Sequence, residues 1–426
     1  MSAKKLSAST LAVIAGLVLA TSVIAQSDNQ SDKQIAFVHV SSAYQRIKYL
    51  ATAEIWSDPG DVTPEMVLAG RPLKESSPEF EAALRGEPLP CSFAKPGKDL
   101  GGNTPKFDCL TPGGATIRVK YSDGSKDGNR EIFSAVVSAK LLWALGFKSD
   151  PIYPITIACS DCPENPMSGA GKRARRSYLA TFQPQLRRLV MVDGDDADEG
   201  WRWGEVDEAI ANLPEGPLRT RQRTHFDALT LLAVFIQHGD RKPEQQRLEC
   251  GSALDPGAGE AHPLEGKDNG APVFFERPDA SACNAPVLAL QDIGATFGGA
   301  GRMSKSTAKM NLEAWTNRPV FKSAKPDSSG AVPECHGNLT VSMAAGEGGR
   351  GDPRIGEAGR AFLQSRLALL SDEHVHALMA TARVEKLSER HTWRDPRTGK
   401  TYAGSPAWVA AFKDKVRQIT ERRCAE

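Results

Sequence analysis

Residues 238–246 read HGDRKPEQQ, and further along the chain residues 290–294 read LQDIG. Each stretch follows an apolar segment, so each brings an acidic side chain, Asp240 or Asp292, to the end of a predicted helix or strand. Phosphoryl transfer needs one carboxylate to orient the nucleophile and accept its proton, together with oxygen ligands for Mg²⁺. The pair therefore predicts metal-assisted phosphoryl transfer, with Asp240 as the catalytic base and Asp292 as a metal ligand.

The composition is that of an ordinary globular protein. The chain has 426 residues and a formal net charge of +1, and 25% of its residues are charged and 40% hydrophobic. These values exclude a disordered tail protein and a polybasic nucleic-acid binder. A chain of this length can bury a sizeable core and is expected to divide into two or three lobes.

The first 25 residues have the features of an export signal. Lys4 and Lys5 precede an apolar stretch, and residues 23–25 (VIA) suit cleavage before Gln26. The apolar run is shorter than the ~20 residues of a membrane span, and no later segment approaches that length. We therefore expect a periplasmic or secreted mature protein without a membrane span. Removal of the signal takes away its two lysines and leaves 51 basic residues against 52 acidic ones, so the net charge does not indicate a class of binding partner.

Eight cysteines follow residue 25, and an even number in an exported chain favours disulfide bonds. Their pairing cannot be read from the sequence, because eight cysteines allow 105 combinations. Cys250 and Cys283 bracket a Gly-, Pro- and Ala-rich insert, residues 251–285, which a bridge between them would tether. Cys159 and Cys162 form a CxxC. A zinc site lacks a second CxxC or a His pair, and a thioredoxin-like redox role is not favoured because ACSDCPENP resembles a loop after a strand rather than the start of a helix.

Residues 101–146 have the clearest local pattern. GGNTPKFDCL, from Gly101, is a Gly-rich turn followed by a strand, TPGG is a turn, and ATIRVKY is a second strand that carries Lys120. Asn129 is a candidate cap for a helix over residues 130–146, which Gly146 ends. Glu131 lies in the first turn of this helix, where compensation of the helix dipole or pairing with Lys120 would explain it.

The rest of the chain is predicted more coarsely. PIYPITIAC is a strand, and GKRARRS, residues 171–177, is a basic loop. A helix over residues 226–237 leads into HGDRKPEQQ, and helices are expected at about residues 355–370, 372–386 and 405–423. The acidic run 193–199 resembles the start of an EF-hand, but Ala197 occupies a ligand position.

Several of these motifs resemble those of known kinases. HGDRKPEQ resembles the catalytic loop of protein kinases, HRDxKPEN, position for position, while GDR followed by QDIGATFG is closer to the phosphoinositide kinases and their relatives. GGNTPKF and NREIFSAVVSAKLLWALGF resemble the Gly-rich loop and the following helix of HipA-type toxin kinases. The resemblance covers about residues 100–300. The whole chain is also similar to exported bacterial proteins of unassigned activity that share these runs.

The resemblance implies an α+β, two-lobed protein-kinase-like fold. A 26–95 N-terminal extension would follow the signal, a small β-rich N-lobe would span 96–200, and a mostly helical C-lobe with the 251–285 insert would span 201–426. ATP and Mg²⁺ would be the cofactors. The implied site has Gly101, Gly102 and Lys120 at the nucleotide phosphates, Glu131 pairing with Lys120, Asp240 as base and Asp292 on the metal.

The chain departs from the kinase pattern at Gln245. These kinases carry a metal-binding Asn there, so a longer neutral amide takes its place and a second metal is in doubt. Gln246 is an alternative ligand. His238 is expected to support its loop by hydrogen bonding rather than to react.

We predict ATP- and Mg²⁺-dependent phosphotransfer to an acceptor that the sequence does not identify. The alternatives are a non-catalytic kinase-like binding or scaffold protein of the cell envelope, nucleotidyl transfer such as AMPylation, and an unrelated secreted fold held by disulfides. ATP is scarce outside the cytoplasm, and this scarcity keeps the non-catalytic alternative open.

Overall fold

The computed structural model describes thirteen stretches of the chain. They are residues 43–71, 77–95, 104–122, 128–183, 200–238, 243–250, 262–263, 274–275, 286–299, 306–323, 332–339, 352–387 and 391–426. The predicted signal, Gly101, Gly102, Asp240, the acidic run 193–199 and most of the insert 251–285 lie outside the described residues.

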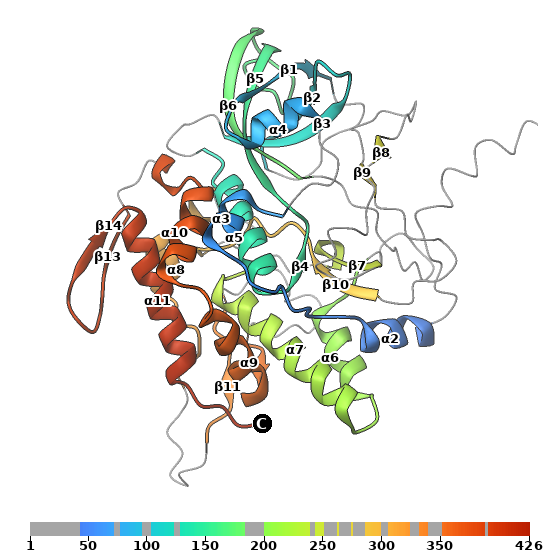
Figure 1. Cartoon of the computed structure of the whole chain (residues 1–426), viewed down its shortest axis with the longest axis vertical. Helices are drawn as coiled ribbons and strands as arrows, with labels where there is room; N and C mark the ends of the chain where they lie inside the picture. The colour runs from blue at the N-terminus through green and yellow to red at the C-terminus, as the bar shows by residue number, and fades with distance from the viewer. Residues whose placement is uncertain are drawn as a thin grey trace, which may run out of the picture.

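Five strands form a closed barrel, which lies at the top of Figure 1. In spatial order they are β1 (Pro88–Ala94), β2 (Lys106–Leu110), β3 (Thr116–Ser122), β6 (Ala174–Phe182) and β5 (Tyr153–Cys162). All neighbours are antiparallel except β1 and β5, whose parallel pairing closes the barrel. The residues that alternate inward, among them Phe107, Tyr121 and Tyr178, fill a core of their own.

Helix α4 (Pro78–Leu84) packs on this barrel, where the ring of Phe80 lies 4.6 Å from that of Phe182. Disulfide bonds join Cys91 to Cys109, linking β1 with β2, and Cys159 to Cys162 at the end of β5. The CxxC sulfurs are therefore bonded to each other. A third disulfide joins Cys335 to Cys424. The suggested Cys250–Cys283 bridge is not tested, because Cys283 lies outside the described residues.

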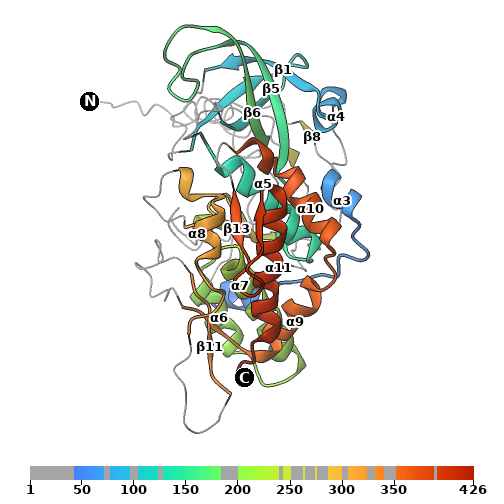
Figure 2. The same cartoon turned by 90° about the vertical axis from the view of Figure 1, so that its left-hand side faces the viewer.

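Helix α5 (Glu131–Ala144) lies directly beneath the barrel in both views (Figures 1 and 2). Nearly every one of its side chains is buried, in a second and larger core that is separate from that of the barrel. A three-stranded sheet adjoins it, in the order β4 (Lys148–Ser149), β10 (Pro286–Leu290) and β7 (Gln246–Cys250). β10 is buried along its whole length, which agrees with its unbroken apolar sequence.

The larger core is enclosed by helices from both ends of the chain. Helix α7 packs on α9, α10 packs on α3 and α11, and α2 packs on α6. Aromatic side chains of α7, α8 and α11 meet there, with the rings of Trp315 and Trp408 stacked at 5.8 Å. The bounds of these helices are α2 (Ala43–Thr52), α3 (Pro64–Ala69), α6 (Trp203–Ala211), α7 (Pro217–Phe235), α8 (Leu312–Thr316), α9 (Glu357–Leu367), α10 (Asp372–Thr381) and α11 (Ser405–Glu421).

Short elements complete the structure. Three two-stranded ladders pair β8 (His262–Pro263) with β9 (Phe274–Phe275), β11 (Cys335–His336) with β12 (Arg354–Ile355), and β13 (Thr392–Arg394) with β14 (Thr401–Ala403). Single 3₁₀ turns occur at η2 (Pro243–Gln245), η3 (Ser306–Ala308) and η5 (Val384–Lys386). No helix within the described stretches is long and apolar enough to cross a bilayer.

The expected mixture of helix and sheet is confirmed, whereas the finer two-lobed kinase-like arrangement remains a proposal. Two local predictions were wrong. The basic stretch 171–177 is not wholly a loop, because β6 begins at Ala174 and pairs with β5 on a partly exposed edge that tolerates arginines. The helix predicted to begin at residue 226 begins at Pro217 instead. The prediction missed its first turns because they are polar, lie on the surface and have no apolar stripe. In addition, β1 belongs to the barrel although it precedes residue 96.

Candidate active site

Lys120 projects from β3 on the face opposite the barrel core. Its neighbours Val119 and Tyr121 are buried within the barrel, and strand alternation directs Lys120 the other way. Its Nζ donates to Oε1 of Glu131 at 2.7 Å and to Oδ1 of Asp292 at 2.6 Å. The ammonium of Lys120 thus joins the first residue of α5 to Asp292, a loop residue 172 positions after Lys120 in the sequence.

Glu131 is held where α5 begins. Its main-chain N–H donates to Oδ1 of Asn129 at 3.1 Å, which fixes the entry of the helix, and only 3% of the residue is exposed. Its second oxygen, Oε2, accepts from the Thr104 hydroxyl at 2.7 Å and from Nζ of Lys309. Both interpretations of Glu131, compensation of the helix dipole and pairing with Lys120, therefore apply, because the carboxylate lies in the first turn of α5 and pairs with Lys120.

Asp292 follows β10 after one intervening residue. The main-chain N–H of Gln291 donates to the carbonyl of Gln245 at 2.8 Å, which extends the β10–β7 ladder to the start of the turn. Asp292 itself has a φ of 45°, in the left-handed region that Asp tolerates better than most residues. Backbone strain of this kind concentrates at functional sites. The side chain is 37% exposed, so one oxygen holds Lys120 while the carboxylate stays open to a ligand.

Gly294 brings this turn into direct contact with α5. A Cβ atom at Gly294 would lie 2.1 Å from Cγ of Glu131, a separation that real atoms do not adopt. The Ser134 hydroxyl donates to the carbonyl of Gly294, and the hydroxyls of Ser138 and Thr296 lie 2.7 Å apart. The third position of the DxG motif is thus glycine because the helix leaves no room for a side chain.

Two cationic residues of the cluster were not predicted from the sequence. Lys309 precedes α8 by three positions and pairs with Glu131, and Lys106 lies opposite Lys120 in the β2–β3 register. Neither has a local signature, since a lysine in a polar loop or on a strand edge is ordinarily a solvated residue. Lys106 does lie within the GGNTPKF run that resembles a kinase Gly-rich loop, and that resemblance was the available signal for it.

Ion pairing between the lysines and the carboxylates of Glu131 and Asp292 shifts the pKa values in this cluster. Burial opposes a charge on Lys120, but Asp292 and Glu131 outweigh it and raise the pKa of Lys120 above its usual range. Burial favours the neutral form of Glu131, yet Lys120 and Lys309 hold the pKa of that carboxyl well below its ordinary value. Burial and the charge of Lys120 lower the pKa of Lys106. Lys120 and Glu131 are therefore both charged at neutral pH.

The structure describes only some of the other predicted site residues. Gln245 ends η2 and is half-buried, and its carbonyl supports the Asp292 turn as described above. Gln246 and His238 are fully buried, and the main-chain N–H of His238 donates to the carbonyl of Ala233 at 2.8 Å. Complete burial agrees with a supporting role for His238. The metal roles of Gln245 and Gln246, and the roles of Asp240, Gly101 and Gly102, stay predictions.

Asp292 is a described carboxylate that could serve as a ligand for Mg²⁺. Within the thirteen described stretches, no three His, Cys, Asp or Glu side chains gather in a metal-binding group. Mg²⁺ commonly takes one or two carboxylates and completes its octahedron with phosphate oxygens and water. Asp292, partly exposed and two residues beyond a buried strand, fits such a role, with Lys120 beside it for the phosphates.

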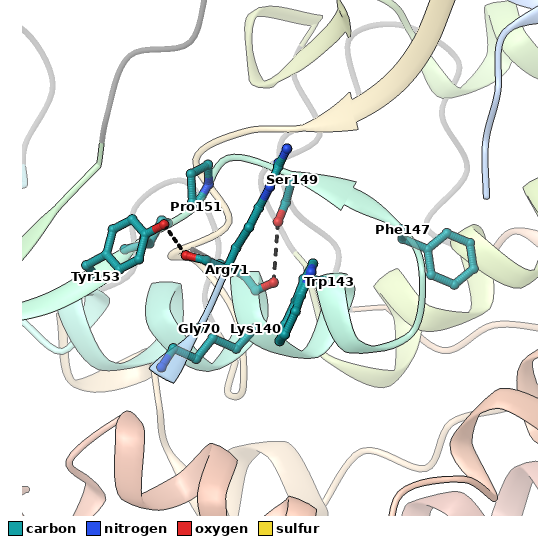
Figure 3. A pocket seen from close by; sticks show the side chains of 10 residues that line it. Gly70, Arg71, Lys140, Trp143, Phe147, Ser149, Pro151 and Tyr153 are labelled. Carbon is teal, nitrogen blue, oxygen red and sulfur yellow. Dashed lines mark hydrogen bonds between the residues drawn. The ribbon is translucent and has the colours of Figure 1, made fainter. Parts of the chain in front are cut away.

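Two described cavities lie outside this cluster and share no residue with it. One, of about 20 Å³, adjoins Lys140 on α5 and has room for about one water molecule (Figure 3). Figure 3 shows the Tyr153 hydroxyl pointing to the main chain of Arg71 at its edge. The other is an open groove of about 490 Å³ between the β13–β14 hairpin, α10 and α11.

Lys140 gives the fold a measurable pH dependence. Burial lowers the pKa of Lys140 to about 8 from an ordinary 10.5. Between these values the unfolded chain binds a proton that the native protein lacks, so this residue makes the free energy of unfolding rise with pH, by up to about 3 kcal/mol. We expect Lys140→Met to reduce the rise in unfolding free energy between pH 7.5 and 9.5, measured by urea unfolding of the oxidised protein, but not to abolish it, because burial also lowers the pKa of Lys415 to about 7. An exposed control, Lys322→Met, should keep the whole rise, and an unchanged pH dependence in Lys140→Met would contradict the assignment.

Comparison with known proteins adds little to this geometry. No protein-family model matches the chain, and no curated protein matches it. Among solved structures, that of a Helicobacter pylori proinflammatory kinase, CtkA, is similar over 78% of this chain and 93% of that chain. The sequence identity is 9% and the TM-score is 0.34, a value that does not establish a common fold.

Proposed function

We propose that the protein binds a magnesium–ATP complex in this cluster and transfers a phosphoryl group to an acceptor. The observation that carries the proposal is the position of Lys120, whose ammonium bridges the carboxylates of Glu131 and Asp292. A charged lysine held beside an open carboxylate is the arrangement that phosphate and its metal require.

Each of these residues has a distinct part in the proposal. Glu131 is buried and its carboxylate accepts hydrogen bonds from Lys120, Thr104 and Lys309. It therefore orients the Lys120 ammonium and does not reach a substrate. Lys120 has two of its donors on carboxylates and one left for a phosphate oxygen. Asp292 would hold Mg²⁺, which supplies charge neutralisation at the phosphates when bound. Asp240 is the proposed base, on the strength of the HGDRKPEQ motif alone.

The two barrel disulfides and the Cys335–Cys424 bond favour an oxidising compartment, which suits the proposed export of the chain. The acceptor would then be encountered in the periplasm or outside the cell. A non-catalytic nucleotide binder is the competing function, because the same ion pairs also join the barrel to the larger core and would brace the fold without turnover.

Radiolabelled ATP distinguishes these functions. The oxidised mature protein is incubated with Mg²⁺ and ATP labelled at the α or γ position, and the label on protein and in solution is followed. Phosphotransfer predicts release or transfer of γ-label only, and nucleotidyl transfer predicts α-label on protein. Turnover of neither label by a protein that binds Mg-ATP would leave the non-catalytic binder as the function.

A further inference from the structure

The groove between the β13–β14 hairpin, α10 and α11 is the larger of the two described cavities, and it shares no residue with the Lys120 cluster. Its volume of about 490 Å³ is that of an ordinary small-molecule site. Both strands of the hairpin contact α11, and α11 packs on α10, so three elements border the groove (Figure 1). The groove therefore has the size and the walls of a binding site, and the proposed phosphotransfer does not use it.

Two neighbouring aromatic rings of the hairpin line this groove. Trp393 and Tyr402 are directly opposite each other in the β13–β14 register, their ring centroids lie 6.2 Å apart, and their planes differ by 29°. Both side chains are half-buried and pack against the larger core. Each of them thus contacts the core with one part and lines the groove with another, where an apolar ligand face can pack on it.

Hydrogen bonds close the hairpin that carries these rings at both of its ends. Oδ1 of Asp395 accepts from the main-chain N–H of Arg397 at 2.8 Å, and the main-chain N–H of Asp395 donates to the carbonyl of Lys400 at 2.9 Å. At the opposite end, the main-chain N–H of Gly404 donates to the carbonyl of His391 at 2.7 Å. The platform is therefore formed before a ligand arrives, which lowers the entropic cost of binding.

The charged side chains in the lining balance one another. With His376 counted as neutral, three carboxylates face three basic groups, and their formal charges cancel. The six are Asp372, Asp395, Asp414, Arg397, Lys413 and Arg417. Nζ of Lys413 lies 2.8 Å from Oδ1 of Asp372. Nη2 of Arg417 lies 2.5 Å from Oδ1 of Asp414. A lining without net charge gives no electrostatic preference for an anion or a cation.

These ion pairs place hydrogen-bond donors and acceptors next to each other. A carboxylate has about four lone-pair positions and a guanidinium has five N–H groups, so each paired group keeps capacity for a ligand. A hydroxyl group both donates and accepts, and it can use either member of a pair. A proline-rich peptide, another ligand of aromatic grooves, has few N–H donors and would leave the carboxylates unused. The lining therefore favours a neutral ligand with an apolar face and hydroxyl groups at its edge, which is the chemistry of a sugar ring.

We infer that this groove is a binding site for a neutral carbohydrate, in which a sugar ring packs on the two aromatic side chains and its hydroxyl groups hydrogen-bond to the two ion pairs. The site is independent of the proposed nucleotide function, because the two sites have no residue in common.

The test is saturation-transfer-difference NMR of the full oxidised mature protein with three neutral tetrasaccharides, maltotetraose, cellotetraose and tetra-N-acetylchitotetraose, each titrated to about 10 mM. We expect saturation of the ring protons of at least one of them. Trp393→Leu removes an aromatic ring and should raise its Kd about tenfold, whereas Trp393→Phe should keep most of the affinity. The matched control is Phe93→Leu, which removes a half-buried ring on β1 and should leave the Kd unchanged.

Two further probes test the ligand class. Tetragalacturonate, an anionic tetrasaccharide, should bind no more tightly than the neutral ones, and a preference for it would overturn the assignment to a neutral sugar. Decaproline should not bind in the groove. Binding of decaproline that depends on Trp393, without binding of the tetrasaccharides, would make the groove a peptide site instead.

The absence of saturation transfer to all three neutral tetrasaccharides would overturn the proposal. Binding that Trp393→Leu leaves unchanged would also overturn it, because the sugar would then lie elsewhere on the protein. If Trp393→Leu fails to fold, Lys413→Met decides, since this side chain is 57% exposed and its replacement leaves the core intact. It removes one donor of the groove and should raise the Kd about fivefold, and an unchanged Kd would contradict the proposal.

Discussion

Replacing Asp292 with asparagine is expected to remove the response to magnesium and nucleotide while leaving the fold intact. The side chain is 37% exposed and an amide oxygen still accepts from Lys120, so thermal stability without ligand should change little. The wild-type protein should gain about 2.7 kcal/mol of unfolding free energy when Mg-ATP is present at 100 times its Kd. The variant should lose most of this gain, and turnover of labelled ATP should fall on the order of 100-fold.

Asp207→Asn is the matched control for this experiment. Asp207 is an exposed carboxylate on α6 that pairs with Arg223, so its amide variant changes charge by the same amount outside the cluster. It should retain both the stabilisation by Mg-ATP and the turnover. An Asp292→Asn protein that behaves like Asp207→Asn would show that Asp292 is not the metal ligand.

Gly294→Ala is expected to have the second large effect, on folding and ligand binding together. The added methyl group would lie 2.1 Å from Cγ and 2.9 Å from Cδ of Glu131, and both belong to a side chain held by Lys120, Thr104 and Lys309. Either the helix start or the turn must move, at a cost of about 1–3 kcal/mol. Urea unfolding should show that loss, and calorimetry should show weakened binding of Mg-ATP.

Gly299→Ala provides the comparison, because it lies five residues further on and introduces the same methyl group. Its Cβ atom would approach Cβ of Ala314 at 3.6 Å, an ordinary van der Waals contact. Its unfolding free energy and its affinity for Mg-ATP should remain close to those of the wild-type protein. A Gly294→Ala variant as stable as Gly299→Ala would mean that the packing of the turn against α5 is looser than the geometry indicates.

The sequence was sufficient for those parts of the site that depend on local pattern. Alternation along residues 116–122 puts Lys120 outside the barrel core, the start of an apolar helix marks Glu131, and an apolar strand ends before Asp292. Their convergence is not a local property. It was expected from the order of the motifs and their resemblance to kinases, and the structure brings the three side chains within hydrogen-bonding distance.

Other features depend on contacts that no short pattern encodes. The barrel closes through parallel pairing of β1 with β5, two strands that β2, β3, α5 and β4 separate in the chain. Lys309 reaches Glu131 across 178 positions, and its neighbourhood in the sequence is a polar loop like many others. The start of β6, with Arg175 and Arg176, was not predicted as a strand. Its first side chains reach solvent, so this stretch has no apolar alternation.

The most direct test of the central claim is chemical labelling with an acyl-phosphate derivative of ATP, which acylates an amine lying against the bound phosphates. The oxidised mature protein is treated with this probe and Mg²⁺, with and without excess ATP, and the acylated lysines are identified by mass spectrometry. The proposed nucleotide site predicts acylation of Lys120 that excess Mg-ATP suppresses and that Asp292→Asn reduces. Acylation confined to exposed lysines such as Lys322, equal with and without ATP, would contradict a nucleotide site built on Lys120, Glu131 and Asp292.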